Sequence, residues 1–279
     1  MIKSLLINES VKALQKKRTY ISFVLIFFLV PLIVLAIGNG AGYLENKIYG
    51  QLEDSFIVVG TLTNGYLASY LIIGILIGQM PFLATIVASE IVSGEYSKGT
   101  FRMYLSRPVS RRIVLLSKLI IVVLYTIIMM LFFVFYTLIV SCILLGTGDL
   151  AVYHMGLLFL GQEDIFWRFS LAFFISSFVM VTISILCFML STFCKNSVTP
   201  IIIAISTVFI GTAISFIPLK IFEIINPFLF TGYIDLFLTS FYDPVPWNLI
   251  LNGFLICFMW SILFISLSFN HFADKEIAT

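Results

Sequence analysis

The residues best able to bind a partner or do chemistry lie in one stretch, from Glu90 to Arg112. Its charged residues are two acids followed by five bases, namely Glu90, Glu95, Lys98, Arg102, Arg107, Arg111 and Arg112. Aromatic and aliphatic side chains alternate with these charges. A connection that only joined two helices would need neither this length nor these aromatics. The mixture favours a short amphipathic helix that docks on a soluble partner. The alternative is a solvated, positively charged loop.

Gly94, Gly99 and Thr100 in this stretch have the spacing of a phosphate-binding loop. Thr100 stands where that loop needs its lysine, and the residues before Gly94 continue an apolar helix rather than a buried strand. The sequence therefore predicts no nucleotide site in this chain. Neither GxSxG nor HExxH appears inside an apolar run, and the four cysteines lack the spacing of metal ligands. We expect no catalytic, metal or disulfide site.

Composition decides the solvent in which this stretch works. Of the 279 residues 61% are hydrophobic and 11% charged, with a mean hydropathy of +1.12. Soluble domains have about a quarter of their residues charged, so a lipid bilayer is the expected environment. The net charge of +2 gives no reason to expect nucleic-acid binding. Six apolar runs are long enough to cross a membrane, at about 20–37, 65–89, 113–145, 169–193, 198–217 and 247–269.

The predicted fold class is all-α: a single polytopic transmembrane domain over residues 1–279, with both termini cytoplasmic. With the N-terminus inside, 13 Lys and Arg residues lie on the cytoplasmic side and 3 outside, the bias typical of membrane proteins. Residues 1–18 form an amphipathic elbow helix, whose lysines are expected to face anionic head groups. Residues 90–112 form the cytoplasmic loop. The proline-broken, apolar segment 218–246 is expected to form short external helices or a re-entrant element.

The apolar runs hold neutral polar residues and almost no ionisable ones. Proton-coupled and ion-coupled carriers usually place charged groups near the membrane midplane, so ion coupling is not expected. Gln79, Thr207 and Asn252 are candidates for a substrate path, although hydrogen bonding within or between helices is the more ordinary role for such groups. Gly74 and Gly78 have the small-xxx-small spacing that permits close helix approach.

The stretch from Glu90 to Lys118 resembles the signature of type-2 ABC exporter permeases, closest to the copper-reductase maturation subgroup. The matching residues are Glu90, Gly99-Thr100, Leu105-Ser106-Arg107-Pro108-Val109-Ser110-Arg111 and Lys118. Ser117 departs from the glycine that is common before the lysine. The elbow helix, the six spans and the ending Phe272–Ile277 extend the resemblance along the whole chain.

The resemblance implies a permease subunit that exports or extracts a substrate with energy from a separate ABC ATPase. ATP and Mg²⁺ would be bound by that ATPase, and this chain would bind no cofactor. The partners would be ATPase subunits, a second permease copy or a sister permease, and the lipid of a bacterial or archaeal cell membrane. The residues expected to couple to the ATPase are Glu90, Gly94, Glu95, Gly99, Thr100, Arg102, Pro108 and Arg111. Two alternatives remain open, a non-transporting scaffold or sensor and a lipid-modifying intramembrane enzyme.

Overall fold

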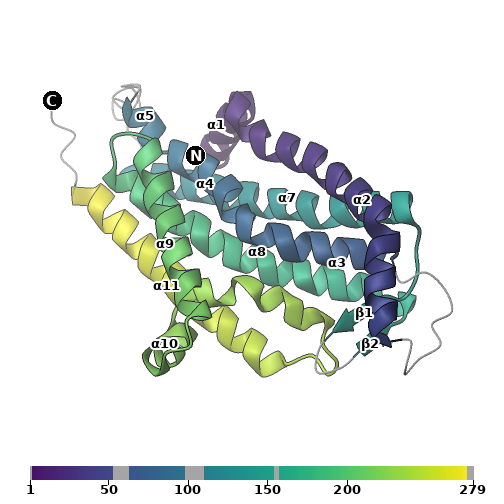
Figure 1. Ribbon diagram of the computed structural model, residues 1–279. Coiled ribbons are helices and arrows are strands. Elements are labelled where there is room, and N and C mark those ends of the chain that lie inside the picture. Colours follow the sequence, from purple (N-terminus) through teal and green to yellow (C-terminus); the bar gives the residue numbers. More distant parts are fainter. Residues whose placement is uncertain (1, 53–62, 98–109, 154–156, 275–279) are drawn as a thin grey trace.

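A computed structural model describes residues 2–52, 63–97, 110–153 and 157–274, and these are almost entirely helical (Figure 1). The elements are α1 (Ile2–Gln15), α2 (Lys17–Leu52), α3 (Gly65–Leu76), η1 (Ile77–Gln79), α4 (Met80–Glu90), α5 (Ser93–Ser97), α7 (Arg111–Leu145), β1 (Leu150–Tyr153), β2 (Leu157–Leu160), α8 (Gln162–Phe193), α9 (Val198–Phe216), α10 (Lys220–Ile225), η2 (Asn226–Phe228), η3 (Phe230–Phe241) and α11 (Trp247–Asp274).

Six helical segments in the described ranges are long and apolar enough to cross a membrane. They are Lys17–Gly40, Gly65–Glu90, Arg111–Leu145, Gln162–Phe193, Val198–Ser215 and Trp247–Phe272. The prediction of an all-α, polytopic membrane protein is therefore confirmed. We refer to the end of the bundle that carries α1, α5 and the start of α7 as the terminal end, and to the end that carries β1 and β2 as the hairpin end (Figure 1).

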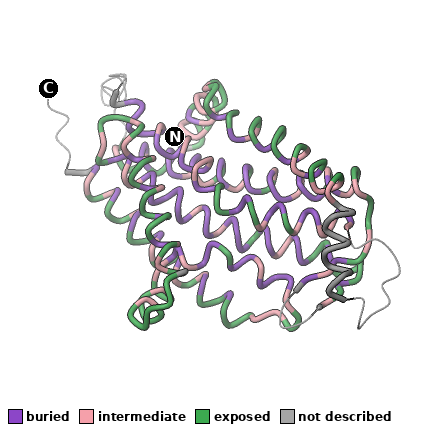
Figure 2. Tube along the Cα trace, viewed as in Figure 1, coloured by how far each residue is buried: buried purple, intermediate pink, exposed green. Residues whose placement is uncertain are grey.

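Helix α8 lies at the centre of the bundle and packs against α4, α7, α11 and η3. Figure 2 shows the burial concentrated along these inner helices, whereas α9, α10 and the outer face of α11 are largely exposed. Hydroxyl groups link α8 to its neighbours: Ser184 lies 2.8 Å from the Thr126 hydroxyl of α7, and Thr182 lies 3.1 Å from the Ser261 hydroxyl of α11. Such contacts help helices associate where lipid removes the hydrophobic driving force.

The second span is broken in its middle. Pro81 has no N–H to give the Ile77 carbonyl, which accepts instead from the Met80 N–H, and residues 77–79 form a 3₁₀ turn. A Cβ added at Gly74 or Gly78, next to this break, would meet nothing within 4 Å. Within one chain these glycines therefore do not provide the close helix contact for which their spacing is suited.

A short antiparallel hairpin of β1 and β2 covers the other end of the second span. Its register pairs Leu150 with Leu160, and both side chains are buried. Asn64 joins the hairpin to α3: its Oδ1 accepts from the Tyr66 and Leu67 N–H groups at 3.0 Å, and its Nδ2 donates to the Asp149 carbonyl at 2.6 Å. One side chain thus caps the helix and holds the strand connection.

The segment 218–246 folds into α10, η2 and η3, with a 78° bend between Lys220–Phe228 and Phe230–Phe241. Helix η3 lies against α8 and α11 with most of its side chains buried. Arg168, one of the three basic residues that the charge count places outside, is buried here. Its Nη1 donates to the carbonyls of Ser240 and Tyr242 at 3.1 and 2.8 Å. The guanidinium thereby satisfies carbonyls at the C-terminal end of η3.

The start of α3 tests how tightly the hairpin end is packed. A Cβ at Gly65 would lie 2.6 Å from Cα of Cys142, and backbone atoms cannot rotate away. We expect Gly65→Ala to destabilise the protein by about 1–3 kcal/mol through overpacking. Gly74→Ala, where the Cβ has open space, is the matched control and should be neutral or stabilising by up to about 1 kcal/mol. Thermal unfolding in detergent measures both, and equal midpoints would contradict the packing described.

Candidate functional site

Four elements that are separate in the sequence meet at the terminal end. Helix α1 lies against α7, α5 follows directly on α4, and α2 begins beside them (Figure 1). The orientation predicted from the charge count would place this end in the cytoplasm. The stretch 90–112 starts here, so that the structure surrounds its first residues with side chains from α1, α2 and α7.

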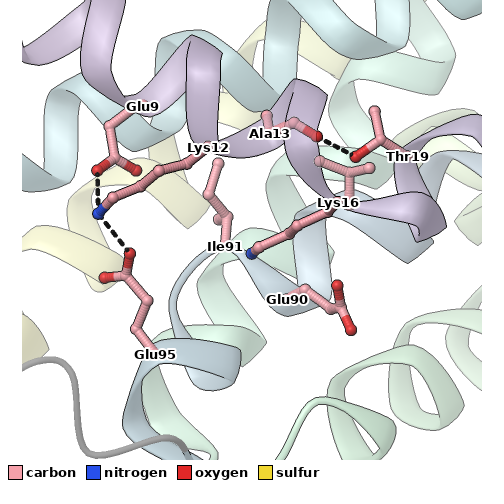
Figure 3. A pocket seen from close by; sticks show the side chains of 9 residues that line it. Glu9, Lys12, Ala13, Lys16, Thr19, Glu90, Ile91 and Glu95 are labelled. Atoms are coloured by element: carbon pink, nitrogen blue, oxygen red, sulfur yellow. Dashed lines mark hydrogen bonds and ion pairs between the residues drawn. The ribbon is translucent and has the colours of Figure 1, made fainter.

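Four charged side chains form a closed ring of ion pairs at this junction, which we call the charge ring: Glu9, Lys12, Glu95 and Lys118. The Lys118 Nζ lies 2.8 Å from Glu9 Oε2 and 2.8 Å from Glu95 Oε2. The Lys12 Nζ lies 3.3 Å from Glu9 Oε1 and 3.4 Å from Glu95 Oε1 (Figure 3). Each lysine bridges both glutamates, and each glutamate oxygen faces a different lysine. The ring ties α1 to α5 and α7.

The charge ring matters for stability because its members Lys118 and Glu9 are buried. The side chains of Lys118 and Glu9 are only 1% and 3% exposed. Taking such ions out of water costs several kcal/mol each, and only close, mutually satisfying partners offset that cost. The ring carries two positive and two negative charges and is neutral as a whole, with the partly exposed Lys12 completing it. It becomes uncompensated as soon as one member is removed.

Sequence reasoning did not bring this ring together. Lys118 was placed in the family signature and among the cytoplasmic cations without a partner, and Glu9 was not singled out. The signals were present, since Glu9 is the only acid in a basic helix and Lys118 lies in an otherwise apolar run. Lys12 was expected to face lipid head groups and pairs inward instead. The apolar side chains Ile7, Val11 and Leu14 of α1 are the exposed ones.

A second ion pair, between Arg18 of α2 and Glu90, ties the end of α4 to the first span. Next to it a polar groove of about 450 Å³ opens between the elbow and the end of the second span. Its lining residues are Gln15, Lys16, Lys17, Arg18, Glu90, Gly94 and Ser197. The groove joins the elbow to Ser197 in the connection between α8 and α9, so that a molecule bound here would contact three parts of the chain.

The structure describes four of the eight residues expected to couple to an ATPase. The Glu90 side chain pairs with α2, and the Glu95 side chain pairs with α1. Gly94 is buried, and a Cβ added there would point toward Glu90 and Ser197. Arg111 begins α7 and is half-buried. Gly99, Thr100, Arg102 and Pro108 lie outside the described residues.

The three candidates for a substrate path separate in the structure. Gln79 lies at the break in the second span and lines two cavities, one toward α2 and one toward α9 and η3. Thr207 is exposed on α9 and donates to the Ile203 carbonyl of its own helix, and Asn252 is exposed on α11. Neither lines either of these two cavities. Only Gln79 therefore has the geometry of a path residue within one chain.

The charge ring predicts that removing the Lys118 ammonium group strongly lowers the stability of the protein. We expect Lys118→Met to destabilise the protein by about 3–5 kcal/mol, because two glutamates would then share one lysine. Adding Glu9→Gln restores a neutral pair of Lys12 and Glu95 and should recover part of the loss. Arg112→Met, at an exposed position of the same helix, is the control. Thermal unfolding in detergent compares them, and a Lys118→Met midpoint equal to that of the control would refute the energetic role of the ring.

Comparison with known proteins identifies the family to which this chain belongs. Over 204 residues the chain is 26% identical to the uncharacterized protein YhcI of Bacillus subtilis, an alignment that covers 69% of this chain and 63% of that protein. The chain thus spans less than two thirds of the length of this relative. The family model described as "ABC-2 family transporter protein" matches residues 5–211, from the elbow helix into α9. That match takes in the charge ring, four complete spans and most of the fifth, and this protein therefore belongs to the ABC-2 family of membrane transporter proteins.

Proposed function

We propose that this chain is the permease subunit of an ATP-driven ABC exporter, energised by a separate ATPase that docks on the 90–112 segment. The observation that carries the proposal is the charge ring, together with the family match over residues 5–211. The ring attaches the first residues of the segment to the elbow and to the third span. A partner that moved this segment would therefore move the helices with it.

The proposed transmission follows the ion pairs outward from α5. Glu95 reaches α7 through Lys118 and α1 through Lys12, and Glu90 reaches α2 through Arg18. The first three spans thus share one charged junction close to the docking segment. Coupling between distant sites needs such a physically continuous set of contacts. The copper-reductase subgroup remains a proposal for the closer relationship.

The energy source in this proposal lies outside the chain. ATP and Mg²⁺ would be bound by the ATPase, since the loop-like pattern from Gly94 to Thr100 lacks the lysine that holds phosphate. A second permease copy or a sister permease would complete the pathway. Helices α9 and α11 expose many large apolar side chains, which lipid or a second permease would cover.

Complex formation tests the proposal directly. We expect the neighbourhood of the coding sequence to encode an ABC ATPase. Co-expressed with it, this chain should purify in detergent as a stable complex that hydrolyses ATP at a rate different from that of the ATPase alone. Size-exclusion chromatography and phosphate release measure the two properties. Absence of a complex would contradict the proposal. A complex with an unchanged ATPase rate would favour the scaffold or sensor instead.

The Arg18–Glu90 pair offers a sharper test of coupling. Glu90→Arg places two cations together, and we expect it to leave membrane insertion intact while the permease loses its effect on ATP hydrolysis. The exchange variant Arg18→Glu/Glu90→Arg restores the pair in reverse and should recover most of that effect. Glu163→Gln, at an exposed position in the first turn of α8, is the neutral control. Wild-type behaviour of Glu90→Arg would remove the assigned coupling role.

A further inference from the structure

A cavity of about 200 Å³ lies between the break in the second span, α9 and η3. Most of its lining is apolar, and aromatic rings of Phe82 and Phe209 meet edge to face at its wall, 5.6 Å apart. Three polar side chains also line it, Gln79 from η1, Thr212 from α9 and Asp235 from η3. Gly74 and Gly78 leave the backbone of the second span uncovered on this side.

Asp235 is the unusual member of this lining. Within the described ranges its carboxylate has neither an ion pair nor a hydrogen bond, and its side chain remains accessible. Arg168 also contacts η3, but its Nη1 donates to the Ser240 and Tyr242 carbonyls. The charge ring compensates its glutamates with lysines, whereas the cavity leaves a carboxylate among aromatic and aliphatic groups. This carboxylate is exposed and unpaired beside an apolar cavity, so it is available to pair with a cationic group bound there.

The neighbouring polar groups define what would complete the site. The Thr212 hydroxyl donates its proton to carbonyls of its own helix, Val208 at 3.0 Å and Phe209 at 3.0 Å, which leaves its oxygen able to accept. Gln79 offers a further acceptor oxygen. A carboxylate and two neutral oxygens match the three N–H donors of a primary ammonium group. The aromatic faces of Phe82 and Phe209 would also attract a cation.

We infer that this cavity binds the ammonium head of an amphipathic amine, with Asp235 as its counter-ion. The volume of about 200 Å³ is below that of a typical pocket for a drug-sized ligand, so the apolar tail extends beyond it along the exposed side chain of Ile75. The identification of this amine as exported cargo rests on the proposed function. The binding site itself needs no ATPase.

Photolabelling of the purified full-length chain in phosphatidylcholine nanodiscs tests the site. Three probes share one diazirine-bearing dodecyl chain and end in an amine, an alcohol or a carboxylate. We expect the amine to label peptides containing Phe82 and Phe209 about tenfold more than the alcohol, as a charge-assisted hydrogen bond would give. The carboxylate should label least. Equal labelling by amine and alcohol would overturn the inference.

Variants identify the residue responsible. Asp235→Asn keeps the shape and should lower amine labelling about tenfold, to the level of the alcohol. Glu223→Gln, at an exposed position in α10, should leave it unchanged. Thr212→Val retains the carboxylate and removes one acceptor, so it tests the site even if Asp235→Asn folds poorly. Its expected loss of amine labelling is smaller, and an unchanged preference in either folded variant would overturn the assignment.

Two further results separate this inference from its alternatives. If Asp235→Asn dissociates a permease dimer while amine labelling persists, the carboxylate belongs to a subunit contact and the inference is wrong. Amine-selective labelling without an ATPase complex would leave the site standing and remove the proposed export function. A functional complex whose permease shows no amine preference would overturn the amine site and leave the proposed export function standing.

Discussion

The burial of the Lys118 ammonium group is the constraint on which the terminal end of this protein depends. A lysine that is 1% exposed inside a helical bundle needs anionic partners within hydrogen-bonding distance. Those partners come from α1 and α5, so the elbow helix and the segment after the second span must both be in place before the third span is electrostatically satisfied. Lys12 completes the compensation from the elbow. One buried charge thus determines how three elements meet, and it does so where the docking segment begins.

The protein treats its other charges in two contrasting ways. Within the described residues the guanidinium of Arg168 is stabilised by backbone carbonyls rather than by an acid, and it holds the end of η3 against α8. Asp235 belongs to η3 itself and lines a cavity. Its carboxylate has no partner in the described part of the chain. The terminal end is therefore closed and compensated, which suits a junction that transmits movement. The cavity beside the break in the second span is open and uncompensated, which suits a ligand.

Much of the architecture could be predicted from the sequence because lipid imposes simple rules on a spanning helix. Length and apolarity alone located six spans, since every backbone group must be hydrogen-bonded within its own helix. Some neutral polar groups take the ordinary role expected of them: Thr182 and Ser184 bond between helices, and Thr207 bonds to its own backbone. The break near Gln79 follows from Pro81, whose missing N–H is a local property of the sequence. The resemblance in the 90–118 stretch indicated the family that the comparison confirmed at the level of ABC-2 transporters.

The sequence by itself determined the membrane environment, the helical class and the segment richest in charge, because these depend on local composition and periodicity. Only the tertiary structure decided which charges are compensated. Glu9 and Lys118 are separated by 109 positions, and no local pattern pairs them. The same holds for Arg168 with the carbonyls of η3, for Asn64 with the β1–β2 hairpin, and for Asp235, Gln79 and Thr212, which line one cavity. A side chain's free energy depends on what surrounds it in space, and in a bundle those surroundings come from distant parts of the chain.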